Sequence, residues 1–147
     1  MKKILIINGP NLNMLGLREP EIYGRATYDD LVGFIRSRCG EAAELEFYQS
    51  NHEGALIDRI QAARGVFDGI VLNAGGYTHT SVALRDAVAA CGVPTAEVHI
   101  SDVMKRESFR HFSFLTDVCV ITVAGKGFES YTEAIGFLLR DGEGARA

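Results

Sequence analysis

The segment Ile4-Leu-Ile-Ile-Asn-Gly-Pro10 is a run of branched apolar residues that stops abruptly at a turn. Such a run, bounded by Gly and Pro, is typical of a buried strand. Comparable runs recur along the chain, at residues 45–49, 69–73, 95–100 and 118–123. The sequence therefore predicts five strands.

Helical patterns separate these strands. Apolar stripes and local signals indicate helices over residues 27–39, 78–90, 105–112 and 131–139. Ser50 and Glu53 have the spacing of a capping box, which predicts the start of a further helix. That helix carries its apolar stripe on Leu56, Ile60 and Ala63.

Strands that alternate with helices form parallel sheets with crossover connections. Five strands and five helices within 147 residues predict an α/β fold of the flavodoxin-like, doubly wound type, with strand order 2-1-3-4-5. We expect a single domain over residues 1–147, in which the polar tail 141–147 frays.

The composition excludes several classes of function. A net charge of −4 argues against a general nucleic-acid-binding protein, which would carry a basic surface. No apolar run suits a signal peptide or a membrane span, so we expect a cytoplasmic protein without a membrane partner. Cys39, Cys91 and Cys119 are odd in number and widely spaced, so neither disulfides nor a metal site is expected.

Polar segments follow four of the predicted strands. In a doubly wound sheet, ligands bind beyond the carboxyl ends of the strands, near the switch between strands 1 and 3. The segments at these ends are Asn8–Asn13, Gln49–Asn51, Asn73–His79 and Glu97–Ser101. Turns alone do not require so many Asn, His and Glu residues, so we predict a functional site there.

Glu97, His99 and Ser101 alternate along the fourth strand and therefore share one face. A carboxylate two residues from a histidine can orient and charge the imidazole for general acid or base catalysis. A buried structural histidine is the competing interpretation for His99. Its place at the end of a strand favours the functional one.

Two arginines and two glycines extend the predicted site. Arg106 and Arg110 are four residues apart on the predicted short helix, so together they indicate an anionic or polyhydroxyl ligand; two solvated arginines that pair with Glu107 or Asp102 are the alternative. Gly75 and Gly76 precede a predicted helix. Their backbone N–H groups either face an anion or form a simple tight turn.

The segment Leu15–Gly24 is too long and too interrupted to be a tight turn, and we interpret it as a lid. It carries Arg18 and Tyr23. Tyrosine has an ordinary pKa of about 10 and is a poor base at neutral pH, but nearby guanidinium charge lowers that pKa. A packing role is the alternative for Tyr23.

These segments resemble, in order, the type II 3-dehydroquinate dehydratases (type II dehydroquinases), over residues 3–139. The matching stretches are Asn8–Asn13, Leu15–Gly24, Gln49–Gly54, Asn73–Ala87, Glu97–Ser101, Arg106–His111, Gly125–Gly127 and Tyr131. The resemblance implies a lyase that converts 3-dehydroquinate to 3-dehydroshikimate by trans elimination of water through an enolate. It also implies that the enzyme uses no cofactor, metal or Schiff base.

The resemblance assigns catalytic roles to five residues. Tyr23, as tyrosinate, would remove a proton from C2, and Arg18 on the lid would help to keep it ionised. Asn11 would hold a water that stabilises the enolate. His99, oriented by Glu97, would protonate the departing hydroxyl.

The resemblance also assigns binding roles. The residues near the substrate carboxylate would be Asn73 and the backbone of Ile100 and Ser101. His79 and Arg110 would hold ring hydroxyls, and Arg106 would support the site. Asp86 would reach the site of a neighbouring subunit, because the family forms dodecamers built from trimers.

The chain departs from the family pattern at Asp102, Ser108, Phe112 and Val120–Ala124. These departures concern packing in the fifth strand and contacts between subunits rather than the proposed catalytic positions. A flavodoxin-like flavin- or nucleotide-binding module is the alternative function. It would need a hydroxyl-rich phosphate loop, and Gly9–Asn13 contains neither Ser nor Thr.

Overall fold

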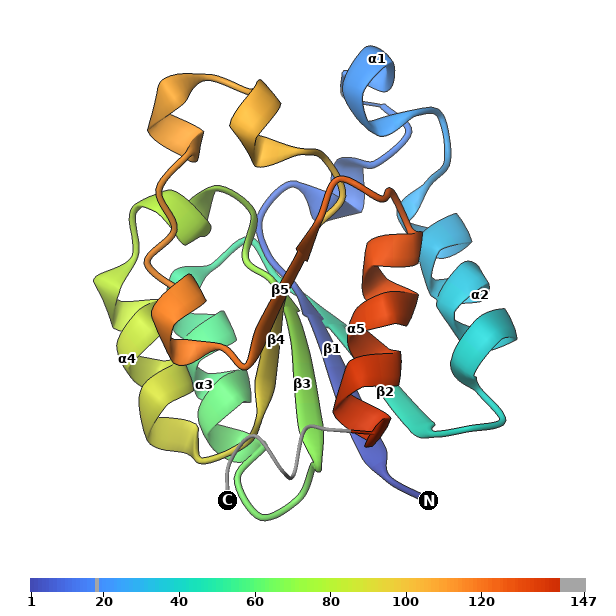
Figure 1. Ribbon diagram of the computed structural model, residues 1–147, viewed down its shortest axis with the longest axis vertical. Coiled ribbons are helices and arrows are strands. Elements are labelled where there is room, and N and C mark those ends of the chain that lie inside the picture. The colour runs from blue at the N-terminus through green and yellow to red at the C-terminus, as the bar shows by residue number, and fades with distance from the viewer. Residues whose placement is uncertain (18, 141–147) are drawn as a thin grey trace.

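The structure is a computed structural model that describes residues 1–17 and 19–140, without the side chains of Ile22 and Tyr23. In this part of the chain a parallel sheet with strand order β2-β1-β3-β4-β5 is covered by helices on both faces (Figure 1). The strands are β1 (Lys3–Asn8), β2 (Glu44–Gln49), β3 (Gly69–Asn73), β4 (Thr95–His99) and β5 (Ile121–Ala124). The predicted fold class and strand order are confirmed. The tail 141–147 lies outside the described residues.

Alternate residues of β1 build the two halves of the core. Ile4 and Ile6 face the layer of α2 (Tyr28–Cys39) and α5 (Glu129–Arg140). Leu5 and Ile7 face the layer of α3 (Glu53–Ala62) and α4 (Val82–Cys91). This division follows from the two-residue period of a strand, and it explains why β1 is apolar from Ile4 to Ile7.

Local capping explains where α2 starts. The α2 helix has a capping box in which the Thr27 hydroxyl accepts from Asp30 N while the Asp30 carboxylate accepts from Thr27 N. The capping box predicted at Ser50 and Glu53 is wrong. Glu53 is already the first residue of α3, and its carboxylate accepts a hydrogen bond from Ser81 instead.

Loops at the carboxyl edge depart from the predicted helices. Residues 75–79 form a 3₁₀ helix, and α4 starts only at Val82, where the Ser81 hydroxyl accepts from Leu84 N. The predicted helix over 105–112 is wrong, because two separate 3₁₀ turns, Val103–Lys105 and Ser108–Arg110, replace it. The strand expected from 118 starts at 121, since a 3₁₀ turn occupies Thr116–Val118.

The two ends of the described chain lie together at the amino edge of the sheet (Figure 1). Lys2 Nζ donates a hydrogen bond to the carbonyl oxygen of Leu139, near the end of α5, at 3.3 Å. The loops that follow β1, β3 and β4 lie at the opposite, carboxyl edge, together with the short helix α1 (Pro20–Tyr23). The fold thus separates both ends of the described chain from the edge where ligands are expected.

Candidate active site

A cavity of about 130 Å³ opens at the carboxyl edge of the sheet, among the loops that follow β1, β3 and β4. Its lining contains most of the residues predicted to form the site. Those residues are Asn11, Asn73, Gly75, Gly76, His79, His99, Ile100, Ser101, Arg106 and Arg110. The structure thus brings together segments that are up to a hundred residues apart in the sequence.

Close backbone contact between the loops after β1 and β3 shapes the cavity floor. Gly9 N donates to Asn73 O at 2.7 Å, and a Cβ at Gly9 would lie 2.5 Å from Ala74 O. Asn11 has a left-handed conformation with φ of 72°, and its N–H donates to Asn51 Oδ1 at 2.9 Å. These contacts turn the chain after β1 across the end of the sheet.

A buried hydrogen-bond chain fixes the Asn73 amide. Its Nδ2 donates to the Tyr131 hydroxyl at 2.8 Å, and its Oδ1 accepts from Gly75 N at 3.2 Å. The Tyr131 hydroxyl in turn donates to Asn8 Oδ1 at 2.6 Å. Burial raises the pKa of Tyr131, so the hydroxyl remains a donor. The α5 helix therefore orients an amide at the cavity wall.

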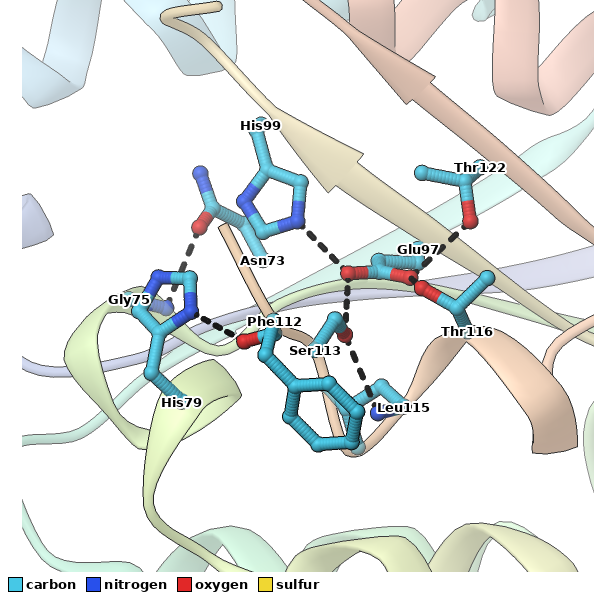
Figure 2. Close-up of polar contacts among 10 residues, drawn as sticks. All are labelled: Asn73, Gly75, His79, Glu97, His99, Phe112, Ser113, Leu115, Thr116 and Thr122. Atoms are coloured by element: carbon cyan, nitrogen blue, oxygen red, sulfur yellow. Dashed lines mark hydrogen bonds and ion pairs between the residues drawn. The ribbon is translucent and has the colours of Figure 1, made fainter. Parts of the chain in front are cut away.

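His99 is paired with a buried carboxylate, as the sequence predicted. Its Nε2 lies 2.7 Å from Glu97 Oε2 (Figure 2), and the two residues are 6% and 1% exposed. An ionised carboxylate can only accept hydrogen bonds, so Nε2 of His99 carries the proton. The second ring nitrogen of His99 points away from Glu97. Glu97 itself lies behind His99 and does not line the cavity.

Three hydroxyl groups complete the surroundings of the Glu97 carboxylate (Figure 2). Ser113 donates to Oε2 at 2.7 Å, while Thr116 and Thr122 donate to Oε1 at 2.7 and 2.9 Å. Burial alone would raise the pKa of Glu97. The pKa is nevertheless lowered to about 2, because other interactions outweigh the effect of burial. These are the hydrogen bonds from His99, Ser113 and Thr116 and the charge of His99.

His79 lies beside His99, with ring centroids 6.4 Å apart and ring planes 18° from parallel. Its Nδ1 donates to the carbonyl oxygen of Phe112 at 2.7 Å, so in the neutral ring Nε2 is an acceptor. Burial is the main cause that lowers the pKa of His79. The nearby charges of His99 and Arg110 act in the same direction, which favours the neutral form.

The two cavity arginines come from different turns, so the prediction that they share one helix face is wrong. Arg106 donates to the Ser101 hydroxyl at 3.2 Å and lies 3.6 Å from carboxylate oxygens of Glu19 and Glu107. Arg110 Nε lies 3.1 Å from Glu107 Oε1. Both guanidinium groups still reach the cavity, because the loop after β4 folds back over it.

Besides Glu97, three predicted residues are not placed in this cavity. Arg18 lies outside the described residues. Tyr23 ends α1, but its side chain is outside that description as well. Asp86 is exposed on α4 and does not line the cavity.

Sequence reasoning missed Ser113, Thr116, Thr122 and Tyr131 as parts of the site. The partners of the three hydroxyl residues are 16, 19 and 25 positions away, beyond the reach of any local motif. Among the described residues, no helix could cross a membrane and no group of three His, Cys, Asp or Glu side chains could hold a metal ion.

Known proteins match this chain over nearly its whole length. A family model described as "Dehydroquinase class II" matches residues 2–139. A "3-dehydroquinate dehydratase 1" from Corynebacterium efficiens is 56% identical over 137 residues, which are 92% of this chain and 91% of that protein. A "Catabolic 3-dehydroquinase 1" from Aspergillus terreus is 52% identical over 135 residues, 91% of this chain and 89% of that protein.

A solved structure agrees in fold as well as in sequence. The crystal structure of a type II dehydroquinase from Butyrivibrio crossotus has a TM-score of 0.91 and 51% identity to this chain. The match covers 93% of this chain and 97% of the other.

Proposed function

The chain belongs to the class II dehydroquinase family, and from this premise we propose how its cavity carries out the family's reaction. The protein is a 3-dehydroquinate dehydratase, a lyase that removes water from 3-dehydroquinate to give 3-dehydroshikimate in the shikimate pathway. The flavin- or nucleotide-binding alternative is not favoured. The proposal concerns the roles of individual residues, the assembly and the location in the cell.

The pairing of His99 with the buried Glu97 is the observation that carries the proposal. The elimination needs an acid that protonates the departing hydroxyl, because hydroxide is a poor leaving group. His99 is that acid. Its Nε2–H is held by Glu97 at 2.7 Å, which leaves the second ring nitrogen to deliver a proton. The fixed charge of Glu97 stabilises the imidazolium before the transfer.

Tyr23 is the proposed base that removes the proton next to the substrate ketone, and Arg18 helps to keep it ionised. Two contacts of neighbouring residues support this role for the lid. Gly24, directly after Tyr23, lines a second cleft of about 520 Å³ together with Ile100 and other residues of the loop after β4. Glu19 also pairs with the cavity residue Arg106.

The enolate that follows proton removal needs a hydrogen-bond donor at its oxygen. Asn11 is proposed to supply it through a water molecule, from the wall formed by the loop after β1. Arg106 and Arg110 suit the carboxylate and hydroxyls of the substrate, because guanidinium groups bind such anions through several N–H donors.

The remaining lining residues are proposed to orient the ring of the substrate. Asn73, with the backbone of Ile100 and Ser101, holds the carboxylate region, and His79 holds a ring hydroxyl. Gly75 and Gly76 leave room for close approach of the substrate.

We further propose a cytoplasmic homododecamer built from trimers. Asp86 supports this assembly, because an exposed carboxylate on α4 can contact a neighbouring subunit but does not line its own cavity. Sizing of the purified protein tests the assembly. An Asp86→Ala variant that loses activity while its subunit remains folded would place the residue in a neighbour's site.

Turnover of 3-dehydroquinate tests the reaction and the base. We expect the purified chain to generate the ultraviolet absorbance of a conjugated enone without any added cofactor. Tyr23→Phe should lower kcat by a factor on the order of 10²–10⁴, the usual worth of general base catalysis. Tyr48→Phe, a half-buried tyrosine on β2 outside the cavity, is the matched control and should keep wild-type turnover.

Two outcomes would contradict the proposal. Wild-type turnover in Tyr23→Phe would show that another group removes the proton. Inactivation by borohydride in the presence of substrate would show that an amine forms a Schiff base during the reaction.

A further inference from the structure

The two oxygens of the Glu97 carboxylate have separate sets of partners. Oε2 accepts from His99 and Ser113, whereas Oε1 accepts from Thr116 and Thr122 (Figure 2). Thr116 lies in the 3₁₀ turn before β5, and Thr122 lies within β5. The oxygen that does not touch His99 is therefore held by groups from outside β4.

The separate partners matter because a carboxylate turns easily about its last bond. The terminal torsion of glutamate is broad and roughly two-fold, so the Glu97 backbone and the bonds that Oε2 accepts from His99 and Ser113 leave its plane free to turn. Two donors on Oε1 pin one end of the carboxylate. Oε2 is then presented to His99 in one orientation, and the imidazole is held with it.

We propose that Thr116 and Thr122 are positioning residues for the dehydration, which act through Glu97 on the orientation of His99. The inference rests on the proposed role of His99 as the acid. Neither threonine lines the cavity, so neither is expected to touch the substrate. Thr122 is one of the departures in the fifth strand, and its hydrogen bond to Glu97, its direct neighbour on β4, gives that departure a role.

Both threonines are exposed residues, so their substitution leaves the buried core intact. Thr→Val keeps the shape and removes the hydroxyl, and Thr→Ser keeps the hydroxyl and removes a methyl group. Thr132→Val makes the same chemical change on α5, where the Thr132 hydroxyl donates to the carbonyl oxygen of Glu129. The three substitutions together separate the loss of the hydroxyl from the loss of packing.

The test compares the double variant T116V/T122V with T116S/T122S and with Thr132→Val. We expect T116V/T122V to lower kcat about tenfold, a part of the 10²–10⁴-fold that an oriented general acid contributes, with KM within about twofold. T116S/T122S should regain most of the wild-type kcat, and Thr132→Val should match the wild type. Unchanged kcat in T116V/T122V, or an equal loss in T116S/T122S, overturns the proposal. A thermal unfolding scan of each variant identifies any that fails to fold, in which case the single variants replace it.

A second measurement separates this inference from the proposed function. In wild-type protein labelled with ¹⁵N-histidine, the buried Nε2–H of His99 should exchange slowly with water, because Glu97 accepts its hydrogen bond. T116V/T122V should accelerate that exchange by about tenfold or more, whether or not the enzyme turns over substrate. If the wild type fails to dehydrate 3-dehydroquinate, the proposed function fails and the exchange still decides the positioning role. If turnover is normal and exchange is unchanged in T116V/T122V, only the positioning role fails.

Discussion

Replacing Glu97 by Gln should remove a pH-dependent part of the folding free energy. The carboxylate is 1% exposed, and its pKa in the folded protein is about 2, against an ordinary value of 4.5. A pKa that is lower in the folded state stabilises the fold at pH values above 4.5. That stabilisation is lost as the pH falls from about 4.5 to about 2.

The size of the effect follows from the two pKa values. At 1.36 kcal/mol per pKa unit, the shift from 4.5 to about 2 corresponds to about 3 kcal/mol of stability at neutral pH. Between pH 7 and pH 3, the protein should lose about 2 kcal/mol of this stabilisation. Gln does not titrate, so the stability difference between wild type and Glu97→Gln should shrink by about 2 kcal/mol over that interval.

Urea unfolding followed by circular dichroism, at one fixed protein concentration, measures this difference at pH 7, 5, 4 and 3. The other carboxylates titrate in both proteins and cancel in the comparison. Glu133→Gln is the control, because this exposed partner of Lys126 should change stability by less than about 1 kcal/mol at any of these pH values. A wild-type-minus-Glu97→Gln difference that stays constant from pH 7 to pH 3 would refute the reasoning.

Three further outcomes test other parts of the structure. Gly9→Ala should destabilise the fold by about 1–3 kcal/mol, because its Cβ would meet the Ala74 carbonyl oxygen; an unchanged thermal midpoint contradicts this. Tyr131→Phe should cost about 1–3 kcal/mol in urea unfolding and raise KM, since it leaves two buried asparagine amides without the hydroxyl that joins them; a neutral result means that the amides find other partners. Burial, with the nearby charge of Glu97, raises the pKa of Cys119, so iodoacetamide at pH 8 should label this thiol at least about tenfold more slowly in folded than in urea-unfolded protein, and equal rates would contradict its burial.

The sheet and its two helix layers could be predicted from sequence because their signals are local. The apolar run of β1 and the stripe on α5 depend on residues a few positions apart, and both are buried as expected. The pairing of Glu97 with His99 is also local, since neighbours at two-residue spacing on a strand share a face.

The loops at the carboxyl edge could not be predicted in the same way. Arg106 follows the first 3₁₀ turn and Arg110 ends the second, so no helical period describes how they reach one cavity. Ser113 and Thr116 are ordinary loop residues in the sequence, and their partner Glu97 lies on β4. Contacts of this kind depend on the folded path of the chain rather than on spacing, so only the structure reveals them. The role of Tyr23 stays a prediction from the sequence.

The hydrogen bond between Lys2 and the last turn of α5 brings the first and last described elements of the chain together. The order of the segments in the sequence could therefore be changed without moving them in space. Because Lys2 and the end of α5 both lie at the edge away from the cavity, a linker could join them and the chain could be opened at another turn of that same edge, such as the one between α3 and β3. Every loop around the cavity would stay tethered at both of its ends in such a circular permutant. The order of the segments along the chain can thus be changed while their arrangement around the cavity is kept.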